Sequence, residues 1–303
     1  MDDDLGRKKR RRLRYVAVTA VAGLATAGAL TAVGAHSGTD PGHDAAPVAK
    51  VSDTPSATAA ASPDATLTRA LNAVKAEGSY QVAALNLDSG ATASYTSGDS
   101  ADTYDTASIV KVDILATLLL QAQDSGTTLT AEQQTLATSM IENSDNDATN
   151  TLWGQIGGAS GLDAANRTFG LADTVAGTDG DWGLTQTTAD DQLKLLQVVY
   201  GDDGSALSAD SQAYIQELMG NVEADQQWGV SAAADSGTSA ELKNGWLQRS
   251  ATELWDINSV GEVTVDGDSV LIAVTSGGAS TESAGIGLVE TVAEAAGDAV
   301  AST

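Results

Sequence analysis

The hydrophobic and polar positions first separate a short N-terminal segment from the rest of the chain. A basic run from Arg7 to Arg14 precedes an uncharged, mostly apolar stretch from Tyr15 to Ala35, an order that is typical of an export signal. The small residues Val33-Gly34-Ala35 fit a cleavage site, but the 21-residue stretch is also long enough to span a bilayer. We therefore predict a signal peptide or membrane anchor over residues 1–35, favour the cleaved signal, and place the remainder outside the cytoplasm.

A polar segment follows, over residues 36–62. It is rich in Pro, Gly, Ser, Ala and Asp and has almost no large apolar residue. A segment of this composition cannot bury a core, so we predict a flexible linker. Hydrophobic periodicity resumes at about Pro63, and the folded domain is predicted over residues 63–303, a length that permits a sizeable core.

Within this domain the hydrophobic spacing alternates between the helical and the strand period. Asp64 is the expected N-cap of the first helix, and Gly78 is expected to end it. The predicted elements are a helix over Asp64–Glu77, strands over Tyr80–Leu87 and Ala91–Thr96, a mostly helical block over Ser108–Met219, strands over Leu254–Val265 and Ser269–Thr275 joined at Asp266-Gly267-Asp268, and a helix over Glu282–Val300.

The order of these elements indicates the fold class. A helix, strands, a block of helices, strands and a final helix favour an α/β (α+β) architecture, in which an antiparallel sheet is flanked by helices and the middle block forms an all-helical lobe. A site is expected in the cleft between the lobes.

Two scarce residue types narrow the chemistry. The chain has no cysteine, which excludes disulfides, thiolate metal sites, cysteine nucleophiles and lipid attachment through an N-terminal cysteine. Its two histidines, His36 and His43, precede the folded domain, so a Ser-His-Asp triad and a histidine zinc site are excluded there. We expect no metal and no cofactor, and any catalytic base has to be Lys, Asp, Glu or Tyr.

The charge is very uneven. From His36 onward, acidic residues outnumber basic ones 38 to 8. Such a surface repels nucleic acid and anionic membranes, so we expect no nucleic-acid partner; a solvated acidic surface for solubility explains the excess. The few cations after Lys75 are Lys111, Arg167, Lys194, Lys243 and Arg249.

Ser108 and Lys111 form the first candidate motif, Ser108-Ile109-Val110-Lys111, where a loop turns into an apolar helix. Residues at i and i+3 share a helix face, so the amine can reach the hydroxyl. A buried lysine with a lowered pKa can act as the base that a serine nucleophile needs, and the helix N-terminus favours a developing oxyanion. An ordinary helix start with a lysine at its surface would have the same spacing.

Two further motifs follow. Ser144-Asp145-Asn146 is either a functional tripeptide or simply the polar N-cap of a helix. Lys243-Asn244-Gly245 lies just before the C-terminal strands, and its glycine would let a substrate backbone approach closely. A surface lysine at a turn is the alternative.

Together, the three motifs resemble those of class A β-lactamases and penicillin-binding proteins. Ser144 lies 36 residues after Ser108, and Lys243 lies 99 residues after Ser144, which matches that family in order and spacing. The resemblance covers about residues 64 to 300. Three segments carry it: Thr106–Lys111 resembles the nucleophile helix, Ser144–Asn150 the Ser-Asp-Asn-x-x-x-Asn segment, and Leu184–Ala189 the threonine-rich stretch after the omega loop.

The resemblance implies roles for individual residues. Ser108 would be acylated with Lys111 as its base, and Ser144 would pass the proton to the leaving nitrogen. Asn146, Lys243, Asn244, Gly245 and Trp246 would bind substrate: Asn146 through the substrate's side-chain amide, Lys243 through its carboxylate, and Trp246, with Ser108, through a backbone N–H of the oxyanion hole.

Two departures from the family pattern bear on the activity. Asn244 replaces the usual hydroxyl residue, and its amide can still donate a hydrogen bond. Class A β-lactamases also carry an omega-loop glutamate that positions the deacylating water, whereas this chain has no glutamate from Trp153 through Asp191. Asp179 or Asp181 could substitute, although an ordinary acidic loop has the same composition.

Three functions remain open at this point. The first is a serine hydrolase that acts on β-lactams or D-alanyl peptides of the cell wall, and the second is an acyl-accepting penicillin-binding or sensor domain that releases its adduct slowly. The third is a cell-envelope domain that has kept the fold without the chemistry. The expected partner is a small molecule or a peptidoglycan peptide, with a membrane tether through residues 15–35 if the signal is retained, and we expect a monomer.

Overall fold

The computed structural model describes residues 61–99, 102–202 and 204–301. The predicted signal or anchor over residues 1–35, and the predicted linker up to residue 60, lie outside the described residues. Within the described ranges, no helix combines the length and the hydrophobicity needed to cross a membrane.

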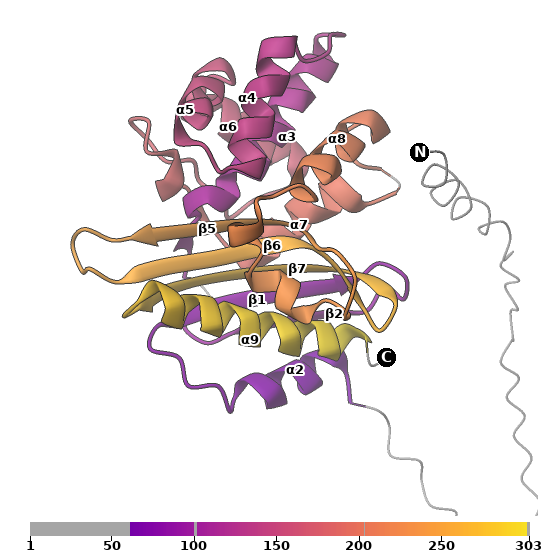
Figure 1. The fold of residues 1–303 in the computed structure, drawn as a ribbon, viewed down its shortest axis with the longest axis vertical. Coiled ribbons are helices and arrows are strands. Elements are labelled where there is room, and N and C mark those ends of the chain that lie inside the picture. Colours follow the sequence, from indigo (N-terminus) through magenta and orange to yellow (C-terminus); the bar gives the residue numbers. More distant parts are fainter. Residues whose placement is uncertain (1–60, 100–101, 203, 302–303) are drawn as a thin grey trace, which may run out of the picture. The chain divides into compact units, whose positions relative to one another are not determined.

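A five-stranded antiparallel sheet forms one half of the folded domain (Figure 1). The strand order is β2-β1-β7-β6-β5. The strands are β1 (Ser79–Asn86), β2 (Thr92–Thr96), β5 (Glu241–Gln248), β6 (Trp255–Val265) and β7 (Asp268–Ala279). The N-terminal hairpin therefore pairs with the C-terminal strands, and β5 is left as an edge strand.

The hairpin between β6 and β7 forms where the sequence predicts it. Asp266 and Gly267 both adopt a positive φ, of 50° and 89°. Two consecutive left-handed residues match the twist of antiparallel strands, and Asp-Gly is a favoured pair for such a turn.

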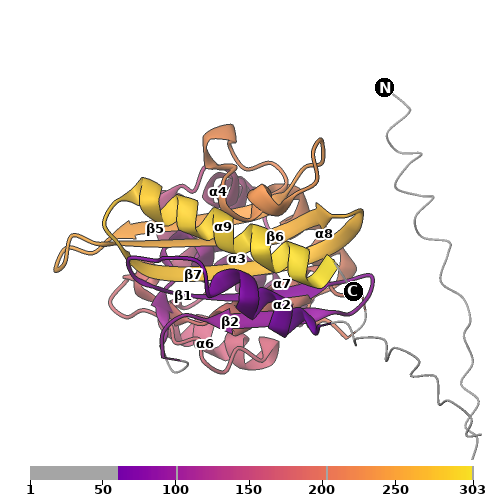
Figure 2. The same ribbon diagram turned by 90° about the horizontal axis from the view of Figure 1, so that it is seen from below.

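Two helices cover the face of the sheet that points away from the helical lobe (Figure 2). They are α9 (Glu282–Ala301) and α2 (Pro63–Leu71), and their buried residues, which include Leu67, Val289 and Val292, join the sheet in one apolar cluster. The α2 prediction is wrong in its limits. Ser62 is the N-cap, with its side chain accepting from Ala65 N, and the helix stops at Leu71 rather than Glu77. Ser62 directly precedes Pro63, whose fixed φ suits the first helical position, and the following residues are needed to reach β1.

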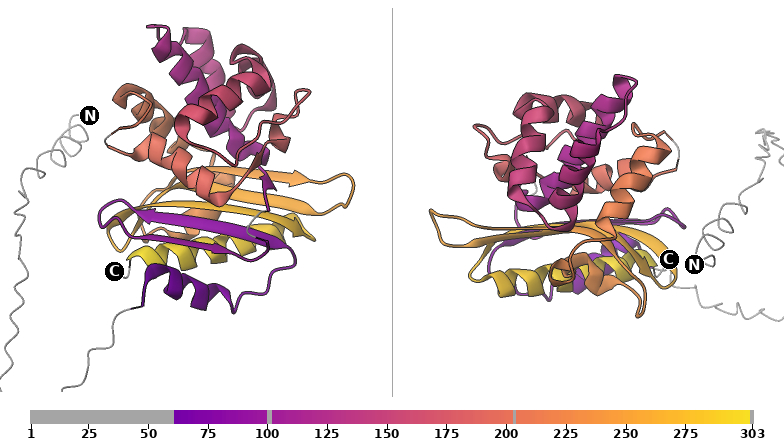
Figure 3. Two further views of the ribbon diagram at one scale, coloured as in Figure 1. Left: turned by 180° about the vertical axis from the view of Figure 1, so that it is seen from behind. Right: turned by 45° about the horizontal axis from the view of Figure 1, so that its top comes forward.

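The helical lobe packs against the other face of the sheet (Figure 3). Eleven of the fifteen residues of α3 (Val110–Asp124) are buried, so this helix forms the centre of the lobe. The remaining helices are α4 (Ala131–Glu142), α5 (Asn146–Gln155), α6 (Gly158–Phe169), α7 (Ala189–Tyr200) and α8 (Ala209–Met219). The predicted fold class is confirmed: an antiparallel sheet with flanking helices and an all-helical lobe.

Short elements connect the two halves. A two-stranded ladder joins β3 (Tyr104–Asp105) to β4 (Gln186–Thr187). Single 3-10 turns occur at η1 (Ala107–Ile109), η2 (Trp182–Leu184), η3 (Ala224–Gln226) and η4 (Gly229–Ala233). Because η1 leads directly into α3, the candidate nucleophile Ser108 lies where the chain passes from the sheet half into the helical lobe.

Candidate active site

Ser108 lies in the 3-10 turn η1, immediately before α3. The preceding residue, Ala107, has a φ of +46°, a conformation that costs about 1–3 kcal/mol for a residue with a side chain. The surrounding structure holds this turn in place, because Thr106 N donates to Thr185 O at 2.8 Å and Asn258 Nδ2 donates to Asp105 O and Thr106 O at 2.8 and 3.0 Å. The Ser108 side chain is half-buried.

Lys111 lies one helical turn further along α3 and is fully buried. Its Nζ donates to Ser144 O at 2.7 Å, to Ser144 Oγ at 3.0 Å and to Asn146 Oδ1 at 2.8 Å. The amine is thereby fixed against the Ser-Asp-Asn segment. The spacing of Ser108 and Lys111 places both residues at the start of α3, as the sequence predicts.

The Ser-Asp-Asn segment forms the N-cap that its sequence allows. Asp145 is the N-cap of α5, with its side chain accepting from Ala148 N at 2.7 Å. Ser144, the residue before the cap, has a φ of +54°, and the chain changes direction there before it enters the helix. The cap therefore fixes the two flanking residues, Ser144 and Asn146, in positions where both reach Lys111.

Lys243 approaches the same hydroxyl from β5. Its Nζ donates to Ser144 Oγ at 3.1 Å and to Asn244 O at 3.1 Å, and its side chain has no exposed surface. Ser144 Oγ therefore lies between the amines of Lys111 and Lys243. Lys111 and Lys243, which are 33 and 99 positions from Ser144 in the chain, meet at one oxygen atom.

Two buried amines this close together cannot both remain fully charged. Burial lowers the pKa of Lys111 to about 7, although the nearby Asp145 carboxylate opposes the shift. Burial, and the neighbouring charge of Lys111, hold the pKa of Lys243 well below its usual range. A neutral amine is thus accessible near neutral pH, and a substrate carboxylate would raise both pKa values by favouring the charged forms.

Gly245 brings the β5 backbone against the Ser108 turn. A Cβ at this position would lie 2.6 Å from Thr106 O and 2.8 Å from Ser108 N, which is closer than packed atoms allow. Only glycine permits this approach. The N–H of Ser108 therefore lies beside β5, the strand whose next residue is Trp246.

Comparisons with known proteins agree with this geometry. The model of the Beta-lactamase enzyme family matches residues 120–300, which is more than half of the chain. The chain belongs to the beta-lactamase enzyme family. This is a family of serine hydrolases of the β-lactamase and penicillin-binding type. The matched range contains Ser144, Asn146 and Lys243 and begins after Ser108 and Lys111.

Solved structures show the same fold at low sequence identity. A class A beta-lactamase from Bacteroides cellulosilyticus superposes with a TM-score of 0.68 and 15% identity, over 80% of this chain and 100% of that one. PBP-A superposes with a TM-score of 0.65 and 21% identity, over 78% of this chain and 96% of that one. A beta-lactamase from Chitinophaga pinensis gives a TM-score of 0.63 and 15% identity, over 77% and 97% of the two chains.

Curated relatives match over a shorter range. Proteins named "Putative lipoprotein LppW" from Mycobacterium bovis and Mycobacterium tuberculosis are 30% identical over 99 residues, which is 33% of this chain. The match spans about a third of the length of these relatives.

One residue of this family member does not lie as predicted. Successive side chains of a strand point to opposite faces, so Asn244 points away from Lys243 and Gly245. It is fully buried, and its Nδ2 donates to Gln226 O at 2.7 Å and to Trp228 O at 3.0 Å. The expectation that the Asn244 amide donates to substrate is corrected: both of its hydrogens are used to hold the segment before η4.

The segment between α6 and α7, the counterpart of the family's omega loop, places no carboxylate among the hydrogen-bond partners given above for Lys111. Asp179 and Asp181 are both exposed to solvent. The side chain from this segment that does reach Lys111 is Trp182, whose ring centroid lies 4.9 Å from Nζ. The structure therefore gives no support to either aspartate as a replacement for the missing glutamate.

Two residues of the site were missed by sequence reasoning. Asn258 has no motif around it, although an amide within the apolar run of β6 is a signal that its side chain needs a buried partner. Trp182 belongs to none of the three motifs. In each case the function comes from contacts between distant segments, which neither hydrophobic periodicity nor motif spacing records.

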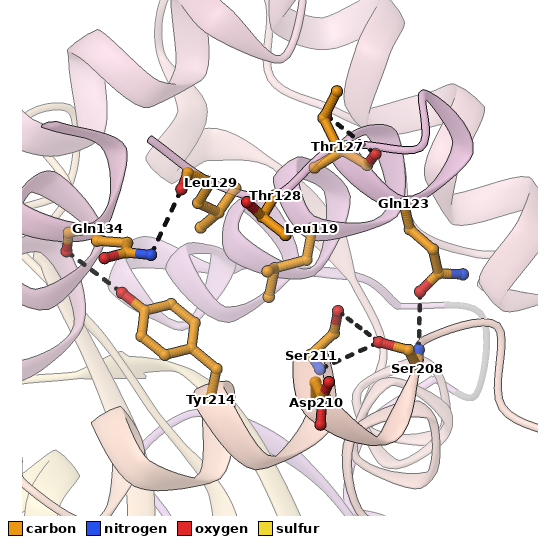
Figure 4. A pocket seen from close by; sticks show the side chains of 11 residues that line it. Leu119, Gln123, Thr127, Thr128, Leu129, Gln134, Ser208, Asp210, Ser211 and Tyr214 are labelled. Atoms are coloured by element: carbon orange, nitrogen blue, oxygen red, sulfur yellow. Dashed lines mark hydrogen bonds between the residues drawn. The ribbon is translucent and has the colours of Figure 1, made fainter. Parts of the chain in front are cut away.

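Within the described residues, metal-ligand clusters are absent and a separate pocket lies away from this site. Within the described ranges, no group of three or more His, Cys, Asp or Glu side chains could hold a metal ion. A pocket of about 330 Å³ lies in the helical lobe and is lined by residues that include Leu119, Leu129 and Tyr214 (Figure 4). None of the predicted site residues lines it, and its polar groups largely bond to one another.

Proposed function

We propose that this protein is a serine hydrolase that is acylated on Ser108 by β-lactams or D-alanyl peptides and cleaves their amide bond. The observation that carries the proposal is the convergence on Ser144 Oγ of the Lys111 and Lys243 amines, at 3.0 and 3.1 Å, beside the turn that bears Ser108. A buried amine with a pKa near neutrality, a bridging hydroxyl and a half-buried serine supply the base, the proton relay and the nucleophile of acyl transfer.

The proposed acylation proceeds in two stages. Neutral Lys111 takes the proton of Ser108 as Oγ bonds to the substrate carbonyl carbon, and the N–H groups of Ser108 and Trp246 stabilise the oxyanion. Ser144 then gives its proton to the leaving nitrogen and regains one from a lysine amine as the C–N bond breaks. The product is an ester on Ser108. Because the amine of Lys111 points to Ser144 and Asn146 in the unliganded site, it has to turn toward Ser108 when substrate binds.

In the same proposal the two remaining motif residues bind substrate. Lys243 would meet a substrate carboxylate, which compensates the cost of charging its buried amine. Asn146 would hold a substrate amide, and its side chain is exposed enough to do so. Gly245 would keep the edge of β5 close to Ser108, because its missing Cβ lets the two backbones touch.

A second candidate is an acyl-accepting penicillin-binding domain that keeps its adduct. One observation favours it: the loop that would carry a deacylating carboxylate points Asp179 and Asp181 into solvent and places Trp182 over Lys111. Hydrolysis of the ester needs an oriented, activated water, and neither aspartate is among the hydrogen-bond partners of Lys111.

We further propose an extracytoplasmic location. The basic run and apolar stretch before Ala35 support export, and relatives from Mycobacterium are named lipoproteins. This chain has no cysteine, so any attachment to the membrane would use the apolar stretch rather than a cysteine-linked lipid.

Intact-protein mass spectrometry after exposure to benzylpenicillin tests the proposal. We expect a mass increase of one penicilloyl group on the full chain and none on Ser108→Ala, because acyl transfer to a serine requires its oxygen. Ser125→Ala is the matched control, since Ser125 is exposed at the opposite end of α3 and should leave labelling unchanged. Equal labelling of Ser108→Ala would reject Ser108 as the nucleophile.

The same measurement separates the two candidates. Once free penicillin is removed, a return to the native mass within minutes supports the hydrolase, whereas an adduct that persists for hours supports the acyl-accepting domain. D-alanyl-D-alanine peptides offered in a parallel assay test the second substrate class through release of free D-alanine.

A further inference from the structure

Trp182 is fixed over the active site from two sides. On the backbone side, its 3-10 turn lies on the nucleophile turn: Thr106 N donates to Thr185 O at 2.8 Å, and the Cβ position of Gly183 is 3.8 Å from Ala107 Cα. On the side-chain side, the indole Nε1–H donates to Asn150 Oδ1 at 2.9 Å, on α5. The tryptophan thus links the nucleophile turn to the Ser-Asp-Asn helix.

The loop that carries Trp182 is itself tightly built. A Cβ at Gly177 would lie 2.1 Å from Asp181 O and 3.2 Å from Thr185 N. The backbone at Gly177 therefore touches the backbone of the later part of the same loop. Thr185 Oγ1 also accepts from Gly177 N at 3.1 Å. The indole is therefore placed by a closed loop and not by an extended one.

The ring lies over an amine that is shielded from solvent. Lys111 is fully buried, its three donor directions are taken by Ser144 O, Ser144 Oγ and Asn146 Oδ1, and the indole lies 4.9 Å away. The face of an indole attracts a cation, whereas the exclusion of water favours the neutral amine. Burial lowers the pKa of Lys111, which is the direction that exclusion of water gives.

Release of an acyl group from Ser108 requires water at this place. A water oxygen has to bond to the ester carbonyl carbon, the bond from that carbon to Ser108 Oγ has to break, and the proton lost by water has to reach Oγ through a base. In the proposed acylation Lys111 is the base for Ser108. Its side chain has no exposed surface, and the indole lies on one side of its amine.

We propose that Trp182 is a positioning residue that shields Lys111 from water and thereby prolongs the lifetime of the acyl-enzyme. The inference rests on the proposed acylation of Ser108 and favours the second candidate, the acyl-accepting domain, because it assigns slow release to one side chain. In this proposal the protein is an acyl-accepting domain and not a hydrolase for two reasons: the omega-loop glutamate is missing, and the indole of Trp182 shields Lys111.

The test compares adduct lifetimes in full-chain variants after labelling with benzylpenicillin and removal of the excess. Trp182→Ala should shorten the lifetime about 10-fold, which is less than the 10²–10⁴ that an oriented general base contributes, since water in an unshaped gap is not oriented. Trp182→Phe keeps a ring over the amine and should retain most of the lifetime. Asn150→Ala, which removes only the indole anchor, should shorten it to a smaller extent.

A second readout excludes a merely structural effect. The midpoint of the pH profile for acylation should move upward in Trp182→Ala, because a better hydrated amine has a pKa nearer its ordinary value. Tyr214→Phe, in the remote pocket of Figure 4, is the aromatic control and should change neither quantity. Thermal melts identify variants that do not fold, and Trp182→Phe and Asn150→Ala then carry the test.

The outcomes distinguish this inference from the proposed function. If the native chain forms no adduct on Ser108, the proposed function fails and the inference fails with it. If the adduct forms but its lifetime and the pH midpoint are the same in native chain, Trp182→Ala and Trp182→Phe, only the role of Trp182 is overturned. Release within minutes by the native chain would overturn it as well.

Discussion

The two walls of the active site differ in how firmly their polar groups are held. On the wall formed by β5 and the Ser-Asp-Asn turn, Ser144 Oγ, Asn146 Oδ1 and the two lysine amines all lie within 3.1 Å of a partner. On the wall formed by the loop after α6, Asp179 and Asp181 face solvent, and an indole is what meets Lys111.

The two walls therefore differ in which half of the reaction their groups could serve: formation of the ester on Ser108, or hydrolysis of that ester. In the proposed mechanism, the ordered wall supplies the base, relay and cation for formation of an ester on Ser108. The carboxylates of the loop wall, Asp179 and Asp181, are exposed, and neither is among the hydrogen-bond partners of Lys111. A family fold can therefore keep the machinery of acylation while its loop changes the fate of the acyl-enzyme.

The largest expected effect comes from disturbing the ordered wall at Gly245. In Gly245→Ala the new Cβ would lie 2.6 Å from Thr106 O and 2.8 Å from Ser108 N, so β5 and the nucleophile turn have to separate. We expect the rate of benzylpenicillin acylation to fall by roughly 10², as when an oxyanion donor is lost. Stopped labelling reactions read by mass spectrometry measure this rate.

Gly287→Ala is the control for that change. Gly287 lies in α9, where an added Cβ meets nothing within 4 Å, and alanine is the better helix former. Acylation by this variant should equal that of the native chain. A Gly245→Ala protein that folds and acylates at the native rate would mean that contact between β5 and the nucleophile turn is not required.

The two walls also differ in how far the sequence predicts them. The order of elements, the sheet and the helical lobe follow from hydrophobic periodicity, and the spacing of Ser108 and Lys111 places them about one helical turn apart. The convergence of Lys111, Ser144 and Lys243, which are separated by 33 and 99 positions, is predicted only through the family resemblance.

Other features depend on tertiary contacts that have no periodic signal. The commitment of Asn244 to Gln226 O and Trp228 O, and the indole of Trp182 over Lys111, each join segments that no motif connects. The limits of α2 were missed for a local reason: Ser62 and Asp64 are both good caps, and the following Pro63 favours Ser62.

Titration should reveal the base of the ordered wall. Burial lowers the pKa of Lys111 to about 7, and the proposed acylation uses the neutral amine. The acylation rate should therefore rise about 10-fold per pH unit below pH 7 and level off above it. Benzylpenicillin labelling rates between pH 5 and 9 measure the profile, and a flat profile over this range would exclude Lys111 as the base.

A second buried group titrates in the same range and has to be separated from the first. Asp113 lies two residues after Lys111 on α3 and is almost fully buried. Burial raises its pKa to about 7, although Asn166 and Thr117 beside the carboxyl oppose the shift. Its folded-state pKa thus exceeds the ordinary value, so its contribution to stability is full below about pH 4 and is lost as the pH rises through 7.

Asp113→Asn should remove this loss of stability at high pH, because an asparagine places no charge in the core. It should leave the acylation rate unchanged, since the asparagine keeps the shape of the side chain. At pH 8 the variant should be more stable than the native chain by up to about 4 kcal/mol, the equivalent of a shift of about three pKa units. At pH 4 the two proteins should be nearly equal in stability.

Urea unfolding at both pH values measures the difference, with Asp124→Asn at the exposed end of α3 as the control. If the acylation midpoint moved with Asp113→Asn while stability did not, the titration near pH 7 would belong to Asp113, and the ordered wall would lose its assigned base.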